Sequence, residues 1–493
     1  MKVLNSKTAP KAVAPERIIQ FGEGNFLRAF VDWIVKNMND KTDFNSSVVV
    51  LQGIEDDFVM QLLIGQDCMY HVNLQGRLNG EIVNSFTRVD SISRGVNPFK
   101  QFDSFLALAA QPEMRFIISN TTEAGITFNP ECKLNDRPAS AYPAKLTQLL
   151  WHRFKTFNGC PTKGFIIMPC ELIFENGHHL KDCVNKYIDL WKDDFGGEYE
   201  AFKKWFNEYN YVCATLVDRI VPGFPRKEIN DIQAKLNYKD NIVVQGEAFH
   251  VWVIERPSNM SIEELAAEFP AEKAGLNVII TDSEAPYHER KVTLLNGPHT
   301  VLSPVSYLSG VDIVRDACNH PVLGKYIRKV QFEELMQTLN LPMNELEEYG
   351  ESVLERFNNP FVDHQVTSIM LNSFPKYQTR DLPGVKTYLE RKGELPKGLV
   401  LGLAAIITYY KGGKRADGAD IVPNDDAAIM QLLTDLWATG DTRKVAEGVL
   451  AADKLIWKDH GNLNEIPGLT DLVVEYLDAI QKNGMLATVE SIL

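Results

Sequence analysis

The sequence predicts an α/β protein whose first part builds a parallel sheet and whose second part is mainly α-helical. Short apolar runs alternate with helical stretches as far as residue 281, and this alternation is typical of a parallel sheet. Beyond residue 291 helical periodicity continues while strand-like runs become scarce. A chain of 493 residues is also too long for one ordinary core. We therefore expect two domains, residues 1–282 and 283–493.

The predicted strands and helices follow from the spacing of apolar residues. The strands are expected at 17–21, 47–51, 114–119, 164–168 and 277–281. Helices are expected at 26–38, 343–357, 399–410, 425–437 and 469–481, with a polar loop at 412–418. The run 399–410 is too short to span a bilayer and is expected to be a buried helix. Ligand sites are expected at the carboxyl ends of the parallel strands.

The amino-acid composition indicates which classes of partner the protein is expected to bind. The net charge of −14 argues against nucleic acid or an anionic membrane surface, because both attract clustered Lys and Arg. The negative net charge does not exclude a small anionic substrate, because such a substrate needs only a local positive pocket. The N-terminus lacks the apolar core of a signal peptide, and the seven cysteines include no Cys-x-x-Cys pair. We expect a cytoplasmic protein with reduced thiols, and the oligomeric state stays open.

A glycine-containing loop follows the first predicted strand and precedes a helix. Gly22-x-Gly24 permits a tight turn and close approach of backbone amides to a pyrophosphate at a helix N-terminus. Leu27 stands where the third glycine of the dinucleotide-binding motif is usual, so an ordinary turn is the alternative. The residues expected to bind the cofactor here are Ile19, Gln20, Phe21, Gly22, Glu23, Gly24, Asn25, Phe26, Leu27 and Arg28.

Two acidic positions are further cofactor candidates. Glu55 or Asp56, after the second strand, would bond the ribose hydroxyls and favour NAD over NADP. Glu123, in the polar run after the third strand, would line the nicotinamide pocket. The alternative for all three is a surface carboxylate near the start of a helix.

Lys291, Asn296 and His299 form a compact set of polar groups. At ~100° per residue of an α-helix, Asn296 lies ~140° and His299 ~80° around the axis from Lys291, so all three can face one cleft. A lysine can act as a general base when burial or a neighbouring cation favours its neutral form, and Arg290 and His288 are close in sequence. Lys291 would then carry the proton in alcohol–ketone interconversion, and Asn296 would donate to the oxyanion. A surface lysine, a cap and a turn histidine are the alternative.

A metal-dependent mechanism is not expected. A zinc-dependent alcohol dehydrogenase needs three protein ligands to the metal, at the spacing of a metal-binding motif. The histidines at 178, 179, 288, 299, 320 and 364 show no such spacing, and scattered structural histidines are the simpler interpretation.

Taken together, these motifs resemble the polyol-specific long-chain dehydrogenase/reductase family, which includes mannitol dehydrogenases and hexuronate reductases. The resemblance rests on Lys291-x4-Asn296-x2-His299 and Gly22-x-Gly24-x-Phe26-x-Arg28, and it extends through 217–220 and 356–360. Segments 17–30, 119–125, 169–173 and 216–221 are similar to the hexuronate reductases that act on tagaturonate.

The resemblance implies a Rossmann-type first domain, a helical second domain and a site between them. It implies NAD-dependent, metal-independent interconversion of D-altronate and D-tagaturonate, a sugar acid reaction of galacturonate breakdown. Lys291 would be the acid/base, Asn296 an oxyanion donor and His299 a substrate contact. Asp218 and Lys376 fall at substrate-binding positions, and His364 would border the pocket. Fructuronate reductase and a mannitol-type polyol dehydrogenase are the alternatives, and a dinucleotide-sensing protein would not need the lysine.

Two positions depart from the mannitol dehydrogenases of that family. Leu172 replaces an asparagine after the Cys170-Glu171 pair, which leaves the second oxyanion donor open. Ser368 replaces an arginine eight residues before Lys376. Because an anionic substrate needs a cation beside it, Lys376 is the predicted partner of the hexuronate carboxylate.

Overall fold

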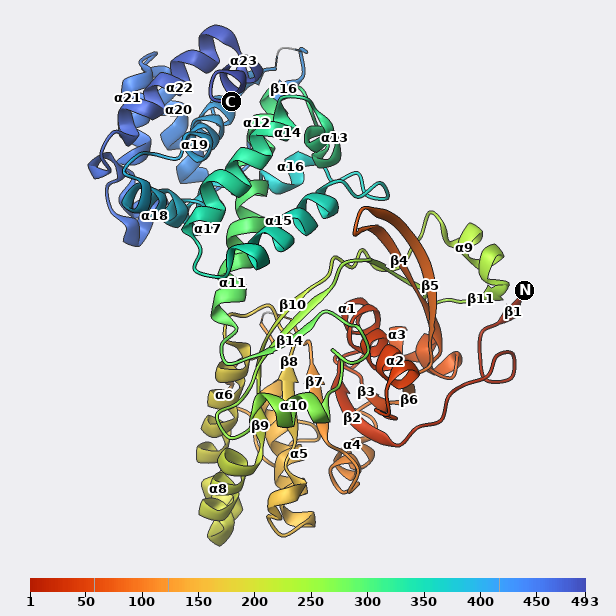
Figure 1. Ribbon diagram of the computed structural model, residues 1–493. Coiled ribbons are helices and arrows are strands. Elements are labelled where there is room, and N and C mark those ends of the chain that lie inside the picture. The colour runs from red at the N-terminus through yellow and green to blue at the C-terminus, as the bar shows by residue number, and fades with distance from the viewer. Residues whose placement is uncertain (57, 123, 416) are drawn as a thin grey trace. The chain divides into compact units, whose positions relative to one another are not determined.

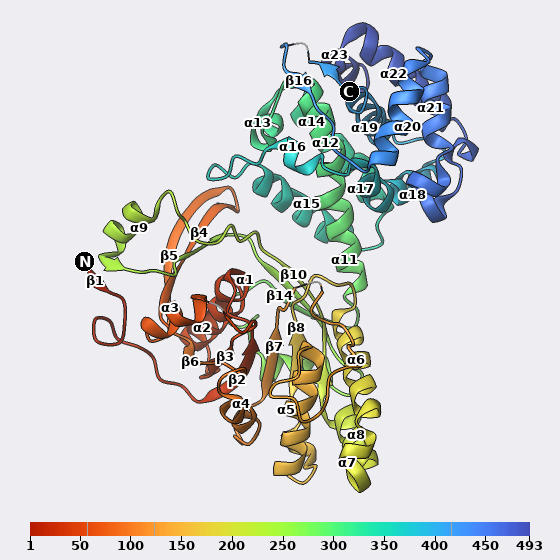
Figure 2. The ribbon, with the colours of Figure 1, turned by 180° about the vertical axis from the view of Figure 1, so that it is seen from behind.

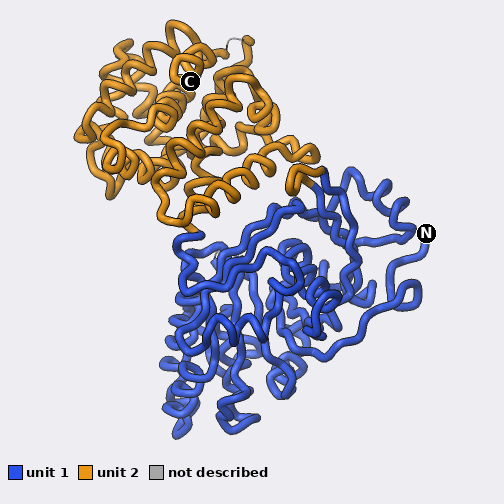
Figure 3. The backbone as a smooth tube through the Cα atoms, viewed as in Figure 1, with its two compact units in different colours: residues 1–75, 82–287 blue, residues 76–81, 288–493 orange. Residues whose placement is uncertain are grey.

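The structure is a computed structural model that describes residues 1–56, 58–122, 124–415 and 417–493. The chain forms two compact units, coloured separately in Figure 3. Unit 1 holds residues 1–75 and 82–287, and unit 2 holds residues 76–81 and 288–493. The division into domains 1–282 and 283–493 that the sequence predicts stays a prediction.

A six-stranded parallel sheet is the centre of unit 1 (Figure 1). Its strands lie in the order β6-β3-β2-β7-β8-β9, which in chain order is the 3-2-1-4-5-6 arrangement of dinucleotide-binding sheets. The order reverses between β2 and β7, so a crevice is expected there at the carboxyl ends. The strands span Glu16–Phe21 (β2), Ser47–Leu51 (β3), Ile92–Val96 (β6), Phe116–Ser119 (β7), Ile166–Pro169 (β8) and Tyr211–Val212 (β9).

Apolar residues on both faces of this sheet explain its two helical layers. Alternate side chains of a strand point to opposite faces, and here both sets are buried. Ile18, Val48 and Phe116 pack in one core with α2 (Val31–Lys41), α3 (Phe58–Gly65) and α10 (Ile262–Glu268). Their neighbours Ile19, Val49 and Ile117 pack in the other core with α4 (Phe102–Ala109), α5 (Tyr142–Thr156), α6 (Asn176–Leu190) and α8 (Tyr199–Tyr209). The near-continuous apolar strands of the sequence follow from this double burial.

The predicted helix over residues 26–38 is wrong in one respect, since the structure divides it. Helix α1 covers Asn25–Ala29, and α2 begins at Val31. Phe30 lies between them with φ −117° and ψ −74°, outside the usual α-helical range. Its ring stacks on Phe26 at 5.0 Å and packs on Trp252 at 5.5 Å, so core packing holds the break.

Smaller sheets complete unit 1, as Figure 2 shows from behind. One contains β10 (Ala214–Asp218), β13 (Val251–Glu255) and β14 (Val278–Thr281). Another contains β12 (Val244–Glu247), β4 (Tyr70–Leu78) and β5 (Glu81–Val89), and the last pairs β1 (Lys2–Val3) with β11 (Tyr238–Lys239). The remaining helices are α7 (Lys192–Phe195) and α9 (Ile229–Leu236), with 3-10 turns at Pro161–Lys163 and Gly196–Glu198.

Unit 2 is built around two buried helices, α12 (Gly297–Leu308) and α19 (Lys397–Tyr409). They pack closely, because a Cβ on Gly402 of α19 would come within 2.4 Å of Val301 of α12. Helix α19 is buried almost all round, as the apolar run 399–410 predicted. No helix in the described ranges is long and apolar enough to cross a membrane.

Other helices surround this pair. They are α11 (Ala285–Lys291), α13 (Val314–Asn319), α14 (Leu323–Arg328), α15 (Met343–Phe357), α16 (Val366–Ile369), α17 (Ser373–Arg380), α18 (Leu382–Lys392), α20 (Ala427–Ala438), α21 (Thr442–Leu450), α22 (Leu469–Asn483) and α23 (Met485–Glu490). Wider π turns occupy Val292–Asn296, Lys329–Leu335 and Asp453–Trp457, and 3-10 turns occupy Met336–Thr338, Lys458–His460 and Leu463–Glu465. The α/β fold with a helical second part is confirmed.

The polar loop predicted at 412–418 is wrong in part. Residues Gly413–Lys414 (β15) pair antiparallel with Asp420–Ile421 (β16), so a short ribbon begins inside the predicted loop. The ribbon was not visible in the sequence because it has no alternation of apolar and polar residues.

Candidate functional site

A π turn separates Lys291 from His299. Helix α11 ends at Lys291, the π turn covers Val292–Asn296, and α12 begins at Gly297. The N–H of Gly297 donates to the carbonyl of Val292, five residues earlier instead of the four of an α-helix. The regular α-helix predicted from the sequence for Lys291–His299 is therefore wrong.

Pro298 gives a physical reason for the turn. It has no N–H, so it cannot donate to the carbonyl of Leu294, its partner in a regular α-helix. Gln331, which is fully buried, takes that place: its Nε2 donates to the Leu294 carbonyl at 3.2 Å. The same Nε2 also donates to the Gly350 carbonyl at 3.1 Å. The side chain of Gln331 thereby ties the turn to α15.

The extra residue in this turn changes which side chains share a face. If the π turn absorbs one residue, Asn296 lies about 40° and His299 about 20° around the axis from Lys291. All three are half-buried. The structure therefore brings the three predicted residues onto one face, more closely than a regular α-helix would.

His299 is held by aromatic neighbours. Its ring stacks on Phe357 with centroids 4.0 Å apart and lies edge-on to His364 at 5.4 Å. Burial lowers the pKa of His299 well below its usual value, and His364, Arg356 and Arg380 lower it further. The ring is therefore neutral at physiological pH. Within the described residues its buried Nε2 has no hydrogen-bond partner.

Cations gather around the same histidine. Arg356 is buried at the end of α15, and Arg380 is the half-buried last residue of α17. Lys376 lies one turn before Arg380, and its Nζ donates to the Ile369 carbonyl at 2.6 Å. Ser368 is exposed and donates to the Gln365 carbonyl at 2.7 Å. The sequence analysis identified Lys376 and His364 but missed Phe357 and Arg380 as neighbours of His299.

In unit 1 the glycine loop lies where the sheet order reverses. Gly22 follows β2 with φ +115°, a conformation that favours glycine, and a Cβ there would meet the Asn120 carbonyl and Leu27 at 3.2 Å. Gly24 has φ −62°, is exposed, and has open space where a Cβ would stand. A backbone that leaves such space beside a helix N-terminus fits a pyrophosphate.

Two acidic side chains hold neighbouring loops at this edge of the sheet. Oε2 of Glu23 accepts a hydrogen bond from the Gly53 N–H at 3.0 Å, which ties the loop after β2 to the loop after β3. Glu171 is buried after β8 and accepts hydrogen bonds from Ser119 Oγ, Thr121 Oγ1 and the Thr121 N–H. Burial raises the pKa of Glu171. These bonds make the crevice a preformed surface.

A cavity of about 240 Å³ adjoins this loop. Phe21, Gln52 and Thr121, which lie at or just beyond the ends of β2, β3 and β7, contribute to its wall. The rest of the lining is Gly53, Pro98, Ala124, Gly125, Thr127, Ser140, Ala141, Tyr142 and Lys145. Its position at the carboxyl ends of parallel strands suits the nucleoside part of a dinucleotide.

The remaining predicted cofactor residues have separate places. Arg28 is buried and donates to the carbonyls of Glu23 and Ile242 and to Asn25 Oδ1, so it braces the loop from inside. Ile19 is buried in the sheet, and Gln20 donates to the Gly22 carbonyl at 3.0 Å. Glu55 is exposed in the turn after β3, while Glu123 lies outside the described residues.

The candidate substrate and donor residues of unit 1 differ in exposure. Asp218 is buried as the last residue of β10, whereas the Leu172 side chain is 60% exposed after β8. A hydrophobic side chain at 172 cannot donate a hydrogen bond, so a second oxyanion donor from this position is not available. Within the described chain, no group of three or more His, Cys, Asp and Glu side chains could hold a metal ion.

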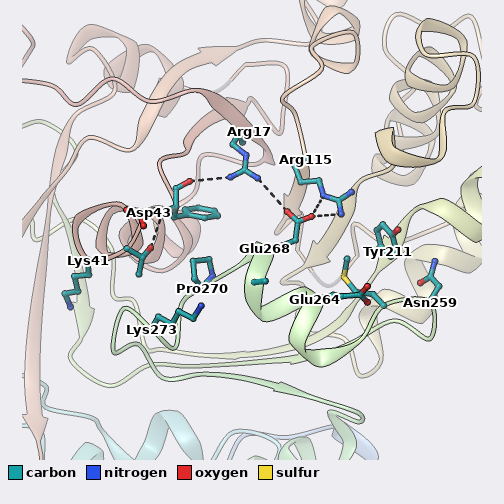
Figure 4. Close-up of a pocket in the computed structure, with 14 residues that line it drawn as sticks. Arg17, Lys41, Asp43, Arg115, Tyr211, Asn259, Glu264, Glu268, Pro270 and Lys273 are labelled. Atoms are coloured by element: carbon teal, nitrogen blue, oxygen red, sulfur yellow. Dashed lines mark hydrogen bonds and ion pairs between the residues drawn. The ribbon is translucent and has the colours of Figure 1, made fainter.

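A larger cavity, of about 810 Å³, lies at the opposite edge of the sheet (Figure 4). Arg17, Arg115 and Tyr211, at the amino ends of β2, β7 and β9, contribute to its wall. Figure 4 shows Glu268 between the two arginines, with ion pairs of 2.9 Å to Arg115 and 3.7 Å to Arg17. These arginine charges are compensated within the protein, and the cavity is remote in topology from the glycine loop.

Comparison with protein families matches both parts of the chain. Residues 16–268 match the mannitol dehydrogenase Rossmann domain, and residues 284–481 match the mannitol dehydrogenase C-terminal domain. The altronate oxidoreductases of Phocaeicola vulgatus and Bacteroides thetaiotaomicron are each 70% identical over 493 residues, all of this chain and all of theirs. The altronate oxidoreductase of Bacillus subtilis is 42% identical over 97% of this chain and 95% of its own.

Two solved structures share the fold at low sequence identity. A substrate-free D-sorbitol dehydrogenase superposes with a TM-score of 0.80 at 19% identity, over 99% of this chain and 100% of its own. The mannitol 2-dehydrogenase of Pseudomonas fluorescens, in a ternary complex with NAD and D-mannitol, gives a TM-score of 0.65 at 20% identity. That match covers 100% of this chain and 99% of the other.

Proposed function

This chain belongs to the mannitol dehydrogenase family and is an oxidoreductase that acts on CH–OH groups, and we propose that it interconverts D-altronate and D-tagaturonate with NAD. The full-length similarity to altronate oxidoreductases supports this substrate pair. The observation that supports the chemistry is the π turn between Lys291 and His299, which would bring Lys291, Asn296 and His299 onto one helix face. The reaction belongs to hexuronate breakdown in the cytoplasm, with a small sugar acid as the substrate.

The residues of unit 1 fit a nicotinamide dinucleotide. The open space beside Gly24 would admit the pyrophosphate, and the cavity bordered by Phe21 and Gln52 would hold the adenosine. The exposed carboxylate of Glu55 would reach ribose hydroxyls, in keeping with NAD rather than NADP. When bound at these residues, a nicotinamide dinucleotide would supply the hydride acceptor for oxidation and the hydride donor for reduction.

Lys291 moves the proton. In oxidation its neutral amine takes the hydroxyl proton of altronate as the carbonyl forms, and in reduction its ammonium returns that proton to the carbonyl oxygen. The Asn296 side-chain amide donates a hydrogen bond to the same oxygen while negative charge develops on it. With Leu172 unable to donate, Asn296 carries this role without help from position 172.

Neutral His299 positions the substrate. Its unpartnered Nε2 would bond a hydroxyl or carbonyl oxygen of the sugar acid, and stacking on Phe357 fixes the plane of the ring. His364, edge-on to His299, borders the same pocket. Asp218 and Lys376 remain proposed substrate contacts from their positions in the sequence.

Initial rates of NADH oxidation with tagaturonate, fructuronate and fructose test this function. We expect turnover of tagaturonate by the wild type and a loss of at least about 100-fold in kcat for Lys291→Ala, the usual contribution of general acid–base catalysis. Lys444→Ala, which changes an exposed lysine of α21, is the matched control. Equal rates for wild type and Lys291→Ala would refute the lysine mechanism. Turnover of fructuronate or fructose without tagaturonate would instead establish a fructuronate reductase or a polyol dehydrogenase.

A further inference from the structure

We propose that Arg380 binds the substrate carboxylate and is the residue by which this enzyme selects a sugar acid over a neutral polyol. This inference rests on the proposed function, since it names the group that recognises the acid end of that substrate. It differs from the sequence-based prediction, which gave the carboxylate to Lys376. Position, available hydrogen-bond donors and charge each support Arg380.

The first argument is position. Arg380 Nη1 donates to Thr300 Oγ1 at 3.3 Å, and Thr300 directly follows His299. Thr300 Oγ1 in turn donates to the Asn296 carbonyl at 2.9 Å. The guanidinium therefore touches the turn of helix that carries both the proposed oxyanion donor and the proposed substrate contact. A carboxylate on Arg380 would belong to a molecule that also reaches His299.

The second argument is the supply of donors. A guanidinium has five N–H donors in a planar fork, and the bond to Thr300 uses one of them. In the described part of the chain, no carboxylate forms an ion pair with Arg380. Other arginines of the same unit form ion pairs, as half-buried Arg315 does with Asp363 at 2.6 Å and exposed Arg443 does with Asp471 at 2.9 Å. Lys376 has fewer donors to offer, because its ammonium has three N–H groups and one of them already donates to the Ile369 carbonyl at 2.6 Å.

The third argument concerns the adjacent acid. Asp381 is fully buried, and neither carboxylate oxygen has a hydrogen-bond partner among the described residues. Burial raises the pKa of Asp381 well above its usual value, which favours the neutral form of its carboxyl. Among the described residues no hydrogen bond joins Asp381 to Arg380, so Asp381 does not occupy the donors of the guanidinium. A half-buried cation without a counter-ion gains more from a ligand carboxylate than an exposed one does.

The chemical difference between sugar acids and polyols explains how Arg380 would discriminate between them. Altronate and tagaturonate end in a carboxylate, whereas a polyol ends in a neutral CH₂OH group. A planar guanidinium binds a carboxylate through two parallel hydrogen bonds, which a hydroxymethyl group cannot match. Arg380 would therefore lower KM for the acid and contribute little to a neutral analogue.

The test compares altronate with altritol, which carries CH₂OH in place of the carboxylate, in NAD reduction by wild type and Arg380→Gln. We expect the variant to raise KM for altronate about 10- to 100-fold, the usual effect of losing a hydrogen bond to a charged group, with KM for NAD unchanged. Arg380→Lys keeps the charge without the fork and should recover part of this loss. Activity with altritol should not fall. Lys376→Met should affect altronate less than Arg380→Gln does.

Several outcomes would overturn the proposal. Equal losses of activity with altronate and with altritol in Arg380→Gln would assign Arg380 a structural role. If only Lys376→Met lost activity with altronate, Lys376 would be the residue that binds the carboxylate. Arg443→Gln, at a surface ion pair, is the matched control. If a thermal unfolding assay shows that Arg380→Gln does not fold, Arg380→Lys becomes the test variant. Its ratio of activity with altronate to activity with altritol should fall below that of the wild type, and an unchanged ratio would contradict the proposal. Failure of the wild type to oxidise altronate would refute the proposed function itself.

Discussion

His299 stacks face to face on Phe357, with ring centroids 4.0 Å apart and 21° between the ring planes. The two residues are separated by 58 positions in the sequence, and each belongs to a segment that the family resemblance singled out. Their contact gives a reason for the segment at 356–360, since Phe357 stacks on the ring and Arg356 adds to the effect of burial and of His364 in lowering the pKa of His299.

Phe357→Leu should weaken substrate binding without unfolding the protein. Leucine keeps an apolar side chain in this buried place but removes the flat surface that orients His299. A loss of about 10-fold in kcat/KM for tagaturonate is expected, the usual value of an aromatic pair. KM for NADH should not change. Phe332→Leu, which changes a half-buried phenylalanine of the same unit, is the control, and equal effects of both changes would refute the orienting role.

Pro298→Ala tests the π turn. Alanine restores an N–H that can donate to the Leu294 carbonyl, so the segment can return to a regular α-helix. Asn296 would then move about 100° around the axis away from Lys291. We expect a large fall in kcat with the protein still folded, measured by NADH oxidation and circular dichroism. Pro304→Ala, later in the same helix, should keep more activity. Full activity of Pro298→Ala would show that the turn does not depend on the proline.

Gly22→Ala and Gly24→Ala should separate stability from cofactor binding. Alanine at 22 adopts a φ of +115° only with strain, so a loss of about 1–3 kcal/mol in the free energy of unfolding is expected. Alanine at 24 has an ordinary φ and open space, so stability should change by less than about 0.5 kcal/mol. Its methyl group would occupy the approach to the pyrophosphate and weaken NADH binding. Urea unfolding and fluorescence titration measure the two effects. Wild-type NADH affinity of Gly24→Ala would contradict the pyrophosphate site.

Glu334 should make stability depend on pH. It is buried and accepts hydrogen bonds from the N–H groups of Gly398 and Leu399, yet burial raises its pKa to about 7. A carboxyl whose folded pKa exceeds its unfolded value of 4.5 binds its proton more tightly when folded. Its contribution is complete below pH 4.5 and is lost as pH rises through 7, with a slope of up to about 1.4 kcal/mol per pH unit.

Glu334→Gln should remove this part of the pH dependence. Urea unfolding between pH 5 and 8, followed by tryptophan fluorescence, measures it. The exposed Glu347 provides the control variant, Glu347→Gln, which should keep the wild-type slope. A wild-type slope in Glu334→Gln would mean that another group titrates in this range.

Much of the fold could be predicted because local patterns match the final environment. The strand at 47–51 agrees with the structure at both ends, since five successive apolar or small residues are buried on two faces of one sheet. The break at Phe30 could not be predicted, because Phe26 and Trp252 hold that ring and one of them lies more than 200 residues away. Tertiary packing there overrides a helical period that the sequence shows without interruption.

The candidate site divides in the same way. The sequence by itself determined the side chains proposed to react: Lys291, Asn296 and His299 lie within nine residues, and the chemistry proposed for them follows from their type. Only the tertiary structure decided the π turn that brings them closer together around the helix axis, because buried Gln331 satisfies the carbonyl that Pro298 leaves without a donor. It also decided which cations surround His299, since Arg356 and Arg380 reach it from separate helices. Side-chain identity is a local property of the chain, whereas the charge around a ring depends on which distant segments pack against it.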